Sequence, residues 1–249
     1  MSVNRRTHRG SRSHNSRAET QQRRTQAERR EHTRQALLGA ALAQVDAGES
    51  FEALSLRSVA REAGVVPTAF YRYFASMDEL GLALVEESFV TLRAMLREAR
   101  EGGLPPERLI RRSVAILVEH VGGNRRHFTF VARVRSSGNA VLRHAVRAEI
   151  RLLTSELATD LARFPLLREW TTEDLQMLAG VLVNTMIAIV ESILELPPND
   201  LGAADRNGAG VSRALADISR IAEKQLRLPL LAVPYWRSTR SGTVSASDD

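Results

Sequence analysis

From residue 28 onward, apolar side chains recur about every three or four residues, which is the spacing of an amphipathic helix. No stretch alternates apolar and polar residues in the manner of a strand. Gly and Pro residues interrupt the periodicity and mark the ends of the predicted elements. The sequence therefore predicts an all-α protein of about nine helices. The expected helices cover residues 30–47 and 56–63, then begin at Pro67, after Ser76 and at Pro105, and continue over residues 127–135, 142–161, 173–196 and 211–228.

Two of these helices begin with side chains that are typical of helix N-termini. Ser76 and Glu79 have the spacing of a capping box, in which each side chain accepts a hydrogen bond from the backbone N–H of the other residue. Thr172 stands directly before the most apolar helix of the chain. We therefore expect both helices to start at these positions.

Positive charge is concentrated near the N-terminus. The chain has 35 Lys and Arg residues against 29 Asp and Glu residues, a formal net charge of +6. Residues 1–34 hold 10 Arg and 3 Glu, so the remainder, with 25 basic and 26 acidic side chains, is nearly neutral. Residues 1–27 also carry almost no large apolar side chain. Because such a segment buries too little surface to offset the entropy of ordering, we expect a disordered basic arm.

The composition and the motifs exclude several classes of protein. The chain has no Cys, which excludes disulfide scaffolds and thiolate zinc sites. The longest uncharged apolar run, residues 175–190, is shorter than the ~20 residues that span a bilayer, and no apolar signal segment follows Met1. The six His residues form no zinc motif, and no Gly-rich phosphate-binding loop is present. We therefore expect a cytoplasmic protein that is not an enzyme, contacts no membrane and holds no metal or cofactor.

Residues 54–74 are the most informative segment, because they predict two short helices joined by a turn at Gly64. This arrangement is a helix-turn-helix. Ala60 stands where the two helices would cross, and Gly64 stands where the first helix would end with a positive φ. The alternative is a two-helix corner of a larger bundle, with the aromatic residues packed inside. The side chains expected in the small core between the two helices are Val59, Val65 and Phe70.

Three residues near the second helix have side chains suited to base edges in the major groove. Arg72 can donate two hydrogen bonds to a guanine. The Thr68 hydroxyl and the Ala69 methyl can contact base edges or a thymine methyl. These residues are our candidates for sequence-specific contacts.

Four further residues are candidates for phosphate contacts, which fix the register of a protein on DNA. The hydroxyls of Tyr71 and Tyr73 can donate hydrogen bonds to phosphate oxygens. Ser55 and Arg57, at the start of the first helix, can bind a phosphate together with the helix N-terminus. The predicted DNA-binding set is therefore Ser55, Arg57, Thr68, Ala69, Tyr71, Arg72 and Tyr73.

The helices after residue 77 are where a small effector would bind, because apolar cavities between bundle helices are common ligand sites. Ordinary core packing is the alternative for each apolar candidate. Asn184 and Thr185 are polar residues in the middle of the most apolar helix, and buried polar groups need partners, so Asn184 joins the effector-binding set. The apolar members of that set are Leu117, Phe128, Val131, Val183, Met186, Ile187 and Val190.

Three segments carry a resemblance to a known family: Leu54-Ser-Leu-Arg-Ser-Val-Ala-Arg-Glu-Ala-Gly64, Pro67-Thr-Ala-Phe-Tyr-Arg-Tyr-Phe74 and Met77-Asp-Glu-Leu-Gly-Leu82. They resemble the DNA-binding domain of TetR-type bacterial transcriptional regulators. With Arg72, the second segment is similar to the FabR/DesT group, the repressors of unsaturated fatty-acid synthesis, whereas Tyr73 replaces the His of many TetR-type proteins.

The resemblance implies a repressor that binds a palindromic operator in double-stranded DNA as a homodimer. For the FabR/DesT group the implied effector is a long-chain acyl-CoA. Its phosphates would meet Arg125, Arg126, Arg133 and Arg135, and the dimer interface would lie on residues 173–196 and 211–228. The expected organisation is a basic arm (1–27), a three-helix helix-turn-helix DNA-binding domain (28–76), a helical bundle for effector binding and dimerisation (77–230) and a flexible tail (231–249).

Two other functions stay open at this point. The same scaffold could regulate efflux or catabolism genes by sensing another apolar molecule. An architectural protein that coats DNA without sequence choice would use the basic arm alone. Affinity for a specific site compared with affinity for random DNA separates these two classes. Either function places the protein in the bacterial cytoplasm, at the nucleoid.

Overall fold

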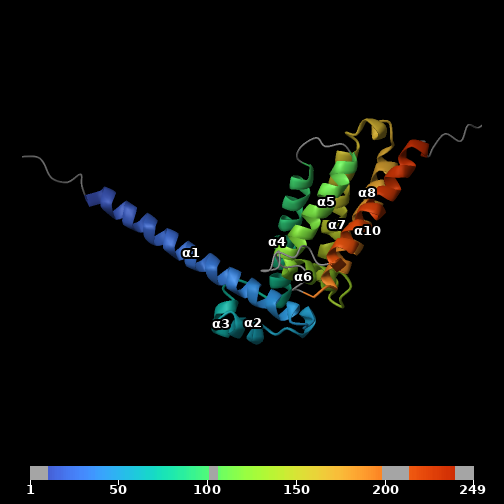
Figure 1. The fold of residues 1–249 in the computed structure, drawn as a ribbon. Helices are drawn as coiled ribbons and strands as arrows, with labels where there is room; N and C mark the ends of the chain where they lie inside the picture. Colours follow the sequence, from blue (N-terminus) through green and yellow to red (C-terminus); the bar gives the residue numbers. More distant parts are fainter. Residues whose placement is uncertain (1–10, 101–105, 198–212, 239–249) are drawn as a thin grey trace, which may run out of the picture. The chain divides into compact units, whose positions relative to one another are not determined.

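The computed structural model describes residues 11–100, 106–197 and 213–238, and these residues are helical or lie in turns and short connections (Figure 1). No residue in these ranges lies in a strand, so the predicted all-α fold class is confirmed. The described α-helices are α1 (Ser11–Asp46), α2 (Leu56–Glu62), α3 (Pro67–Phe70), α4 (Met77–Arg100), α5 (Pro106–Gly123), α6 (Arg125–Arg135), α7 (Ala140–Leu161), α8 (Thr172–Leu194) and α10 (Arg213–Ala232). Short 3₁₀ helices cover η1 (Phe51–Ala53), η2 (Pro165–Leu167) and η3 (Val233–Tyr235).

The chain divides into two compact units. The N-terminal unit comprises residues 1–49 and 53–80, and the C-terminal unit comprises residues 50–52 and 81–249. The division therefore falls one turn inside α4, shortly after the boundary at residues 76 and 77 that the sequence predicts. The short segment 50–52 belongs to the C-terminal unit although α1 precedes it and α2 follows it.

A small apolar core holds α1, α2 and α3 together in the N-terminal unit. Leu37, Val45, Val59 and Phe70 are each at most 1% exposed, and α2 packs against both α1 and α3. A capping box fixes the start of α2, because the Ser55 hydroxyl oxygen accepts a hydrogen bond from the backbone N–H of residue 58 at 3.1 Å, and the side chain there accepts one from the N–H of Ser55. The capping box thus sets where α2 begins, and the apolar core holds α2 on α1 and α3.

The first helix extends much further toward the N-terminus than the sequence predicts. We expect a disordered arm over residues 1–27, whereas α1 begins at Ser11; residues 1–10 lie outside the described residues. The Arg, Gln, Ala and Glu residues of this segment have high helix propensity. Continuing an existing helix also avoids the cost of nucleation, so α1 extends without an apolar face to bury.

Four long helices, α5, α7, α8 and α10, lie side by side in the C-terminal unit (Figure 1). α8 packs against each of the other three. Six of its apolar residues belong to the buried core cluster of the bundle: Leu175, Leu178, Ala179, Leu182, Ile189 and Ile193. Within the described ranges, α8 is the one helix whose length and apolar composition would also suit a membrane span. Packing in the bundle buries 33% of that apolar segment.

The C-terminal segment after residue 230 packs against the bundle instead of forming the expected flexible tail over residues 231–249. Val233 is buried, and the rings of Trp170 and Trp236 lie 6.2 Å apart. The Ser238 hydroxyl binds the Asp174 carboxylate, and this hydrogen bond lowers the pKa of Asp174. The prediction of a flexible tail is therefore wrong for residues 231–238, because Val233 and Trp236 pack against the bundle. Residues 239–249 lie outside the described part.

One predicted N-terminal cap forms in part, and the other is displaced by one residue. The Ser76 hydroxyl accepts from the Glu79 N–H at 3.1 Å as predicted, but the Glu79 carboxylate accepts from the N–H of Ala75 rather than from that of Ser76. At α8 the capping side chain is Thr171, which accepts from the Asp174 N–H at 3.2 Å. The prediction of Thr172 as the N-cap is wrong by one position. Two Thr residues stand side by side, and the side chain of either one can cap a helix.

Replacement of Gly64 by Ala should lower the free energy of unfolding by about 1 kcal/mol. Gly64 ends α2 with a φ of +69°, as the sequence predicts, and a Cβ there would meet no atom within 4 Å. The cost is therefore backbone strain rather than a clash. Urea denaturation measures it, with Gly39→Ala as the control, because Gly39 lies inside α1 with the same open space. Equal effects of the two replacements would contradict the strain.

Candidate nucleic-acid interface and effector cavity

The helix-turn-helix in the N-terminal unit has a fully buried apolar centre. Val59, Ala60 and Phe70 are each 0% exposed, whereas Val65, the third predicted core residue, is half-buried. The N–H of Val65 donates to the carbonyl of Ala60 at 2.9 Å and so closes the turn after α2. The aromatic ring of Phe74 is also buried against that of Phe70, with centroids 5.7 Å apart. The predicted crossing at Ala60 leaves no room for a larger side chain.

The predicted DNA-binding residues all reach the surface of this unit, but only two of them lie on α3. α3 ends at Phe70, so Tyr71, Arg72 and Tyr73 lie in the turn that follows it. The exposed members of the set are Ser55, Arg57, Thr68, Tyr71 and Arg72, and the half-buried members are Ala69 and Tyr73. The Tyr71 side chain is 65% exposed, which is uncommon for so large a ring and leaves its hydroxyl available. The hydroxyl oxygen of Ser55 already accepts the capping hydrogen bond of α2.

An open groove with a volume of about 460 Å³ lies between α1 and the turn after α3. Two of its arginines, Arg29 and Arg30, come from α1 and a third, Arg72, comes from the turn; no acidic residue lines it. Guanidinium groups bind phosphate oxygens well, so this groove suits a nucleic-acid backbone. The predicted DNA-binding set does not include the α1 side of this groove, although the helical spacing of these residues was a readable signal. That side is made by Gln26, Arg29, Arg30 and Thr33.

The C-terminal unit holds a partly open apolar cavity of about 90 Å³ between α4, α5, α6, α7 and α8. Seven of the eight predicted effector-binding residues line it: Leu117, Phe128, Val131, Val183, Met186, Ile187 and Val190. The predicted effector-binding set does not include the walls that α4 and α7 provide, which are Phe89, Leu92, Met95, Ile150 and Leu153. The remaining lining residues are Ala132, Arg135 and Glu191.

The eighth predicted residue, Asn184, does not reach the cavity. Its side chain is exposed, so our expectation of a buried amide is wrong for the described chain. Val183, Ile187 and Val190 share one face of α8 at helical spacing, and a residue next in sequence points about 100° away. The neighbouring Thr185 hydroxyl donates to the carbonyl of Val181 at 2.8 Å and needs no ligand.

The charged side chains at the cavity are Arg135 of α6 and Glu191 of α8, which form an ion pair. The other arginines predicted to meet acyl-CoA phosphates lie elsewhere. Arg125 donates to the carbonyls of Leu194 and Leu196, at 2.6 and 3.0 Å, and thereby caps the end of α8. Arg126 and Arg133 are exposed.

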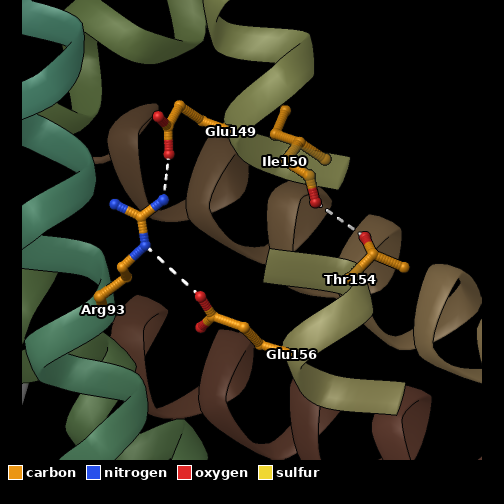
Figure 2. Close-up of polar contacts among 5 residues, drawn as sticks. All are labelled: Arg93, Glu149, Ile150, Thr154 and Glu156. Carbon is orange, nitrogen blue, oxygen red and sulfur yellow. Dashed lines mark hydrogen bonds and ion pairs between the residues drawn. The ribbon is translucent and has the colours of Figure 1, made fainter. Parts of the chain in front are cut away.

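A second polar cluster joins α4 to α7 next to the cavity wall. Figure 2 shows the Arg93 guanidinium of α4 between two carboxylates of α7, those of Glu149 and Glu156. The Arg93 Nε to Glu156 Oε1 distance is 3.7 Å. On α7 the Thr154 hydroxyl donates to the carbonyl of Ile150 at 2.8 Å. Because Leu92 and Ile150 line the cavity, this cluster holds together two of its walls.

Residues 38–84 match the family described as bacterial regulatory proteins, tetR family. The matched segment contains α2, α3 and the turn at Gly64, which are the elements of the helix-turn-helix. This segment of the chain therefore resembles bacterial regulatory proteins of the tetR family. Regulators of this family are generally not enzymes. In the described ranges no group of three or more His, Cys, Asp and Glu side chains could hold a metal ion.

Several solved structures share the fold of this chain. A TetR-like transcriptional regulator from Rhodococcus sp. RHA1 is 22% identical, with a TM-score of 0.55 over 78% of this chain and 96% of that chain. FadR from Bacillus subtilis, in complex with stearoyl-CoA, is 14% identical, with a TM-score of 0.55 over the same shares, 78% and 96%. The fatty acid degradation regulator FadR from Bacillus halodurans is 16% identical, with a TM-score of 0.50 over 78% and 96%. These likenesses concern the fold.

A buried hydrogen bond joins α4 to α6 behind the cavity. The Ser88 side chain is 2% exposed, and its hydroxyl donates to the carbonyl of Leu84 at 2.7 Å. Its oxygen lies 3.1 Å from Nδ1 of His127. Because the hydroxyl has one proton, His127 is the donor in this contact. Burial lowers the pKa of His127 below its ordinary value of 6.5, although the nearby Glu87 carboxylate opposes the shift.

The stability of the C-terminal unit should therefore decrease as the pH falls through about 6.5. In that window the unfolded chain binds a proton at His127 that the folded chain binds only at lower pH. The free energy of unfolding therefore decreases as the pH is lowered. Urea denaturation at about pH 7.5 and about pH 5.5 measures the change. In His127→Asn this part of the pH dependence should be absent, and an unchanged difference between the two pH values would contradict the assignment.

Proposed function

We propose that this chain is a transcriptional repressor of the TetR type that binds a palindromic operator as a homodimer. The observation that carries the proposal is that one chain combines a helix-turn-helix with exposed Thr68, Tyr71 and Arg72 and a separate unit that holds an apolar cavity. The first feature suits base and phosphate contacts, and the second suits a small effector. A cytoplasmic location, at the nucleoid, follows from binding to bacterial DNA.

Apolar side chains on the outside of α8 and α10 support the homodimer. Met177 and Val181 on α8 are 46% and 45% exposed, and Ile221 on α10 is 47% exposed. Packed helices α8 and α10 of two copies would cover these residues in a four-helix interface. DNA geometry also favours a dimer, because two helix-turn-helix units about 34 Å apart enter successive major grooves on one face of DNA.

A long-chain acyl-CoA is our proposed effector, and genes of fatty-acid or lipid metabolism are the proposed targets. Two structural neighbours are FadR proteins, one of them bound to stearoyl-CoA. The apolar cavity has the right chemistry for an acyl chain, but its 90 Å³ is below the roughly 300–1,000 Å³ of sites for larger ligands. Binding must therefore widen it, and the flexible side chains of Met95 and Met186 are the lining residues best able to move.

Genome-wide mapping of the binding sites in the native organism, followed by titration of a mapped operator, tests this function. We expect sites beside fatty-acid synthesis or desaturase genes, and oleoyl-CoA or palmitoyl-CoA at micromolar concentration should change operator affinity at least about fivefold. Free coenzyme A is the control for the phosphates. An unchanged affinity across chain lengths and saturation states would rule out the lipid effector and favour a regulator of efflux or catabolism genes.

A protein that coats DNA without sequence choice is the second candidate, because the groove with Arg29 and Arg30 on α1 suits any DNA backbone. The same titration with random DNA separates the two functions. A true regulator should prefer its operator by about 10³-fold or more at near-physiological salt. A preference of about tenfold or less would support the coating function.

A further inference from the structure

The connection between α1 and α2 is unusual because its residues 50–52 belong to the C-terminal unit, whereas the residues on both sides of them belong to the N-terminal unit. α1 ends at Asp46 and α2 begins at Leu56, so these three residues lie on the path of the chain into the helix-turn-helix. Phe51 in this connection is only 5% exposed. Connecting segments normally run over the surface, so the burial of so large a ring needs a structural reason.

The Phe51 ring packs tightly against α6 and the first turn of α4. It meets the Phe130 ring of α6 edge-to-face, with centroids 5.7 Å apart. On α4, a Cβ at Gly81 would lie 2.8 Å from Cζ of Phe51 and 2.7 Å from Cδ1 of Leu142 on α7. Both distances are shorter than a normal van der Waals contact, so the ring occupies space that only a glycine leaves free.

A polar contact holds the next residue of the connection. The Glu52 carboxylate accepts a hydrogen bond from the backbone N–H of Asn139 at 3.1 Å, and the Ser137 side chain is another partner. Asn139 is itself the N-cap of α7, because its side chain accepts from the N–H of Leu142 at 3.0 Å. The connection is therefore tied to α4, to α6 and to the start of α7.

The same three helices form walls of the apolar cavity. α4, α6 and α7 contribute Phe89, Val131 and Ile150, respectively, among others. Val131 directly follows Phe130, so a shift of α6 at the cavity also moves the ring that Phe51 contacts. A cavity of about 90 Å³ must widen for a larger ligand, and closely packed side chains pass such a displacement on because no free space absorbs it.

We propose that Phe51 and Glu52 carry the state of the cavity to the helix-turn-helix, so that an effector changes DNA affinity by displacing the connection between α1 and α2. The N-cap of α2, Ser55, is only three residues beyond Glu52, so a displaced connection also displaces the start of α2. The inference rests on the proposed function, since it needs an effector in the cavity. It goes further by naming the residues that link this effector to the DNA-binding helices.

A double-mutant cycle on operator affinity tests the inference, with two independent ways to change the cavity. Ala132 lies on α6 in the cavity wall, so Ala132→Leu fills the cavity from within. Oleoyl-CoA at micromolar concentration is the second way. Fluorescence anisotropy with a mapped operator measures the response, which is the ratio of the affinities with and without the cavity change. We expect a response of at least about fivefold to one or both changes in the otherwise unaltered chain.

The decisive variant is Phe51→Leu, which keeps an apolar side chain but loses the ring contact with Phe130. In this variant the response should fall below about twofold. Phe164→Leu is the matched control, because Phe164 is a Phe of the same unit that packs on the core without lining the cavity, and it should keep the full response. A general loss of stability or of DNA affinity leaves the ratio unchanged, so the ratio reports the link itself.

Glu52→Ala is a second test, because Glu52 is exposed and its replacement leaves the core intact. Loss of the hydrogen bond to Asn139 should reduce the response to about half or less. Glu49→Ala is its matched control, since Glu49 is an exposed carboxylate on the same connection but belongs to the N-terminal unit, and it should keep the full response.

The failures of the two proposals give different results. If Phe51→Leu keeps the full response, the signal reaches the DNA by another route, and the inference is refuted while the cavity remains the effector site. If Phe51→Leu does not fold, the response of Glu52→Ala decides the question in the same way. If neither Ala132→Leu nor oleoyl-CoA alters the affinity of a chain that binds its operator, the proposed effector fails, and the inference fails with it.

Discussion

Replacement of Phe130 by Ala should lower the free energy of unfolding of the C-terminal unit by about 3–5 kcal/mol. The Phe130 ring on α6 is 0% exposed and meets the Phe51 ring edge-to-face, with centroids 5.7 Å apart and planes at 71°. Truncation to Ala removes the buried ring, leaves a cavity and also breaks this aromatic pair, which contributes up to about 1.5 kcal/mol beyond its burial. Urea denaturation followed by circular dichroism measures the loss.

Phe164→Ala is the matched control for this prediction. Phe164 belongs to the same unit but is only half-buried at the edge of the core cluster, so its truncation should cost less than half as much. A loss below about 1 kcal/mol for Phe130→Ala would mean that the site collapses around the missing ring. A loss equal to that of Phe164→Ala would mean that full burial of Phe130 and its contact with the Phe51 ring add nothing to stability.

Sequence periodicity places residues on the cavity wall where one helix face decides the environment. Val183, Ile187 and Val190 are spaced so that α8 must turn them to one side, and that side is the cavity. Gly64 was predictable for a similar reason, since a helix end followed at once by another helix requires a positive φ. Local spacing carries enough information for both.

The parts that the sequence did not predict depend on contacts between distant segments. Arg93 binds carboxylates that lie more than 50 residues further along the chain, and nothing in its own neighbourhood indicates them. Trp236 ends an apolar stretch near the C-terminus, and its partner Trp170 lies 66 residues earlier in the chain, where nothing in the local sequence indicates the contact. Asn184 was placed at the cavity by its polar type, although its position on α8 favours the outside.

Arg72→Ala should weaken binding to the specific operator by about 1–3 kcal/mol and change binding to random DNA little, if Arg72 reads a base. The structure adds a competing interpretation, because Arg72 lies in the turn after α3 and shares a groove with Arg29 and Arg30 of α1. An arginine in a groove with other arginines is well placed for a phosphate. A base contact affects binding to the operator alone, whereas a phosphate contact affects binding to the operator and to random DNA alike.

Arg29→Ala is the matched comparison, since Arg29 lies in the same groove but on α1, outside the helix-turn-helix that α2 and α3 form. As a phosphate contact, it should weaken operator and random DNA equally and reduce the slope of log affinity against log salt by about 1. Fluorescence anisotropy with both DNAs at several salt concentrations gives the four affinities and their slopes. If Arg72→Ala behaves like Arg29→Ala, Arg72 binds the backbone, and Thr68 and Ala69 of α3 are then the remaining candidates for base contacts.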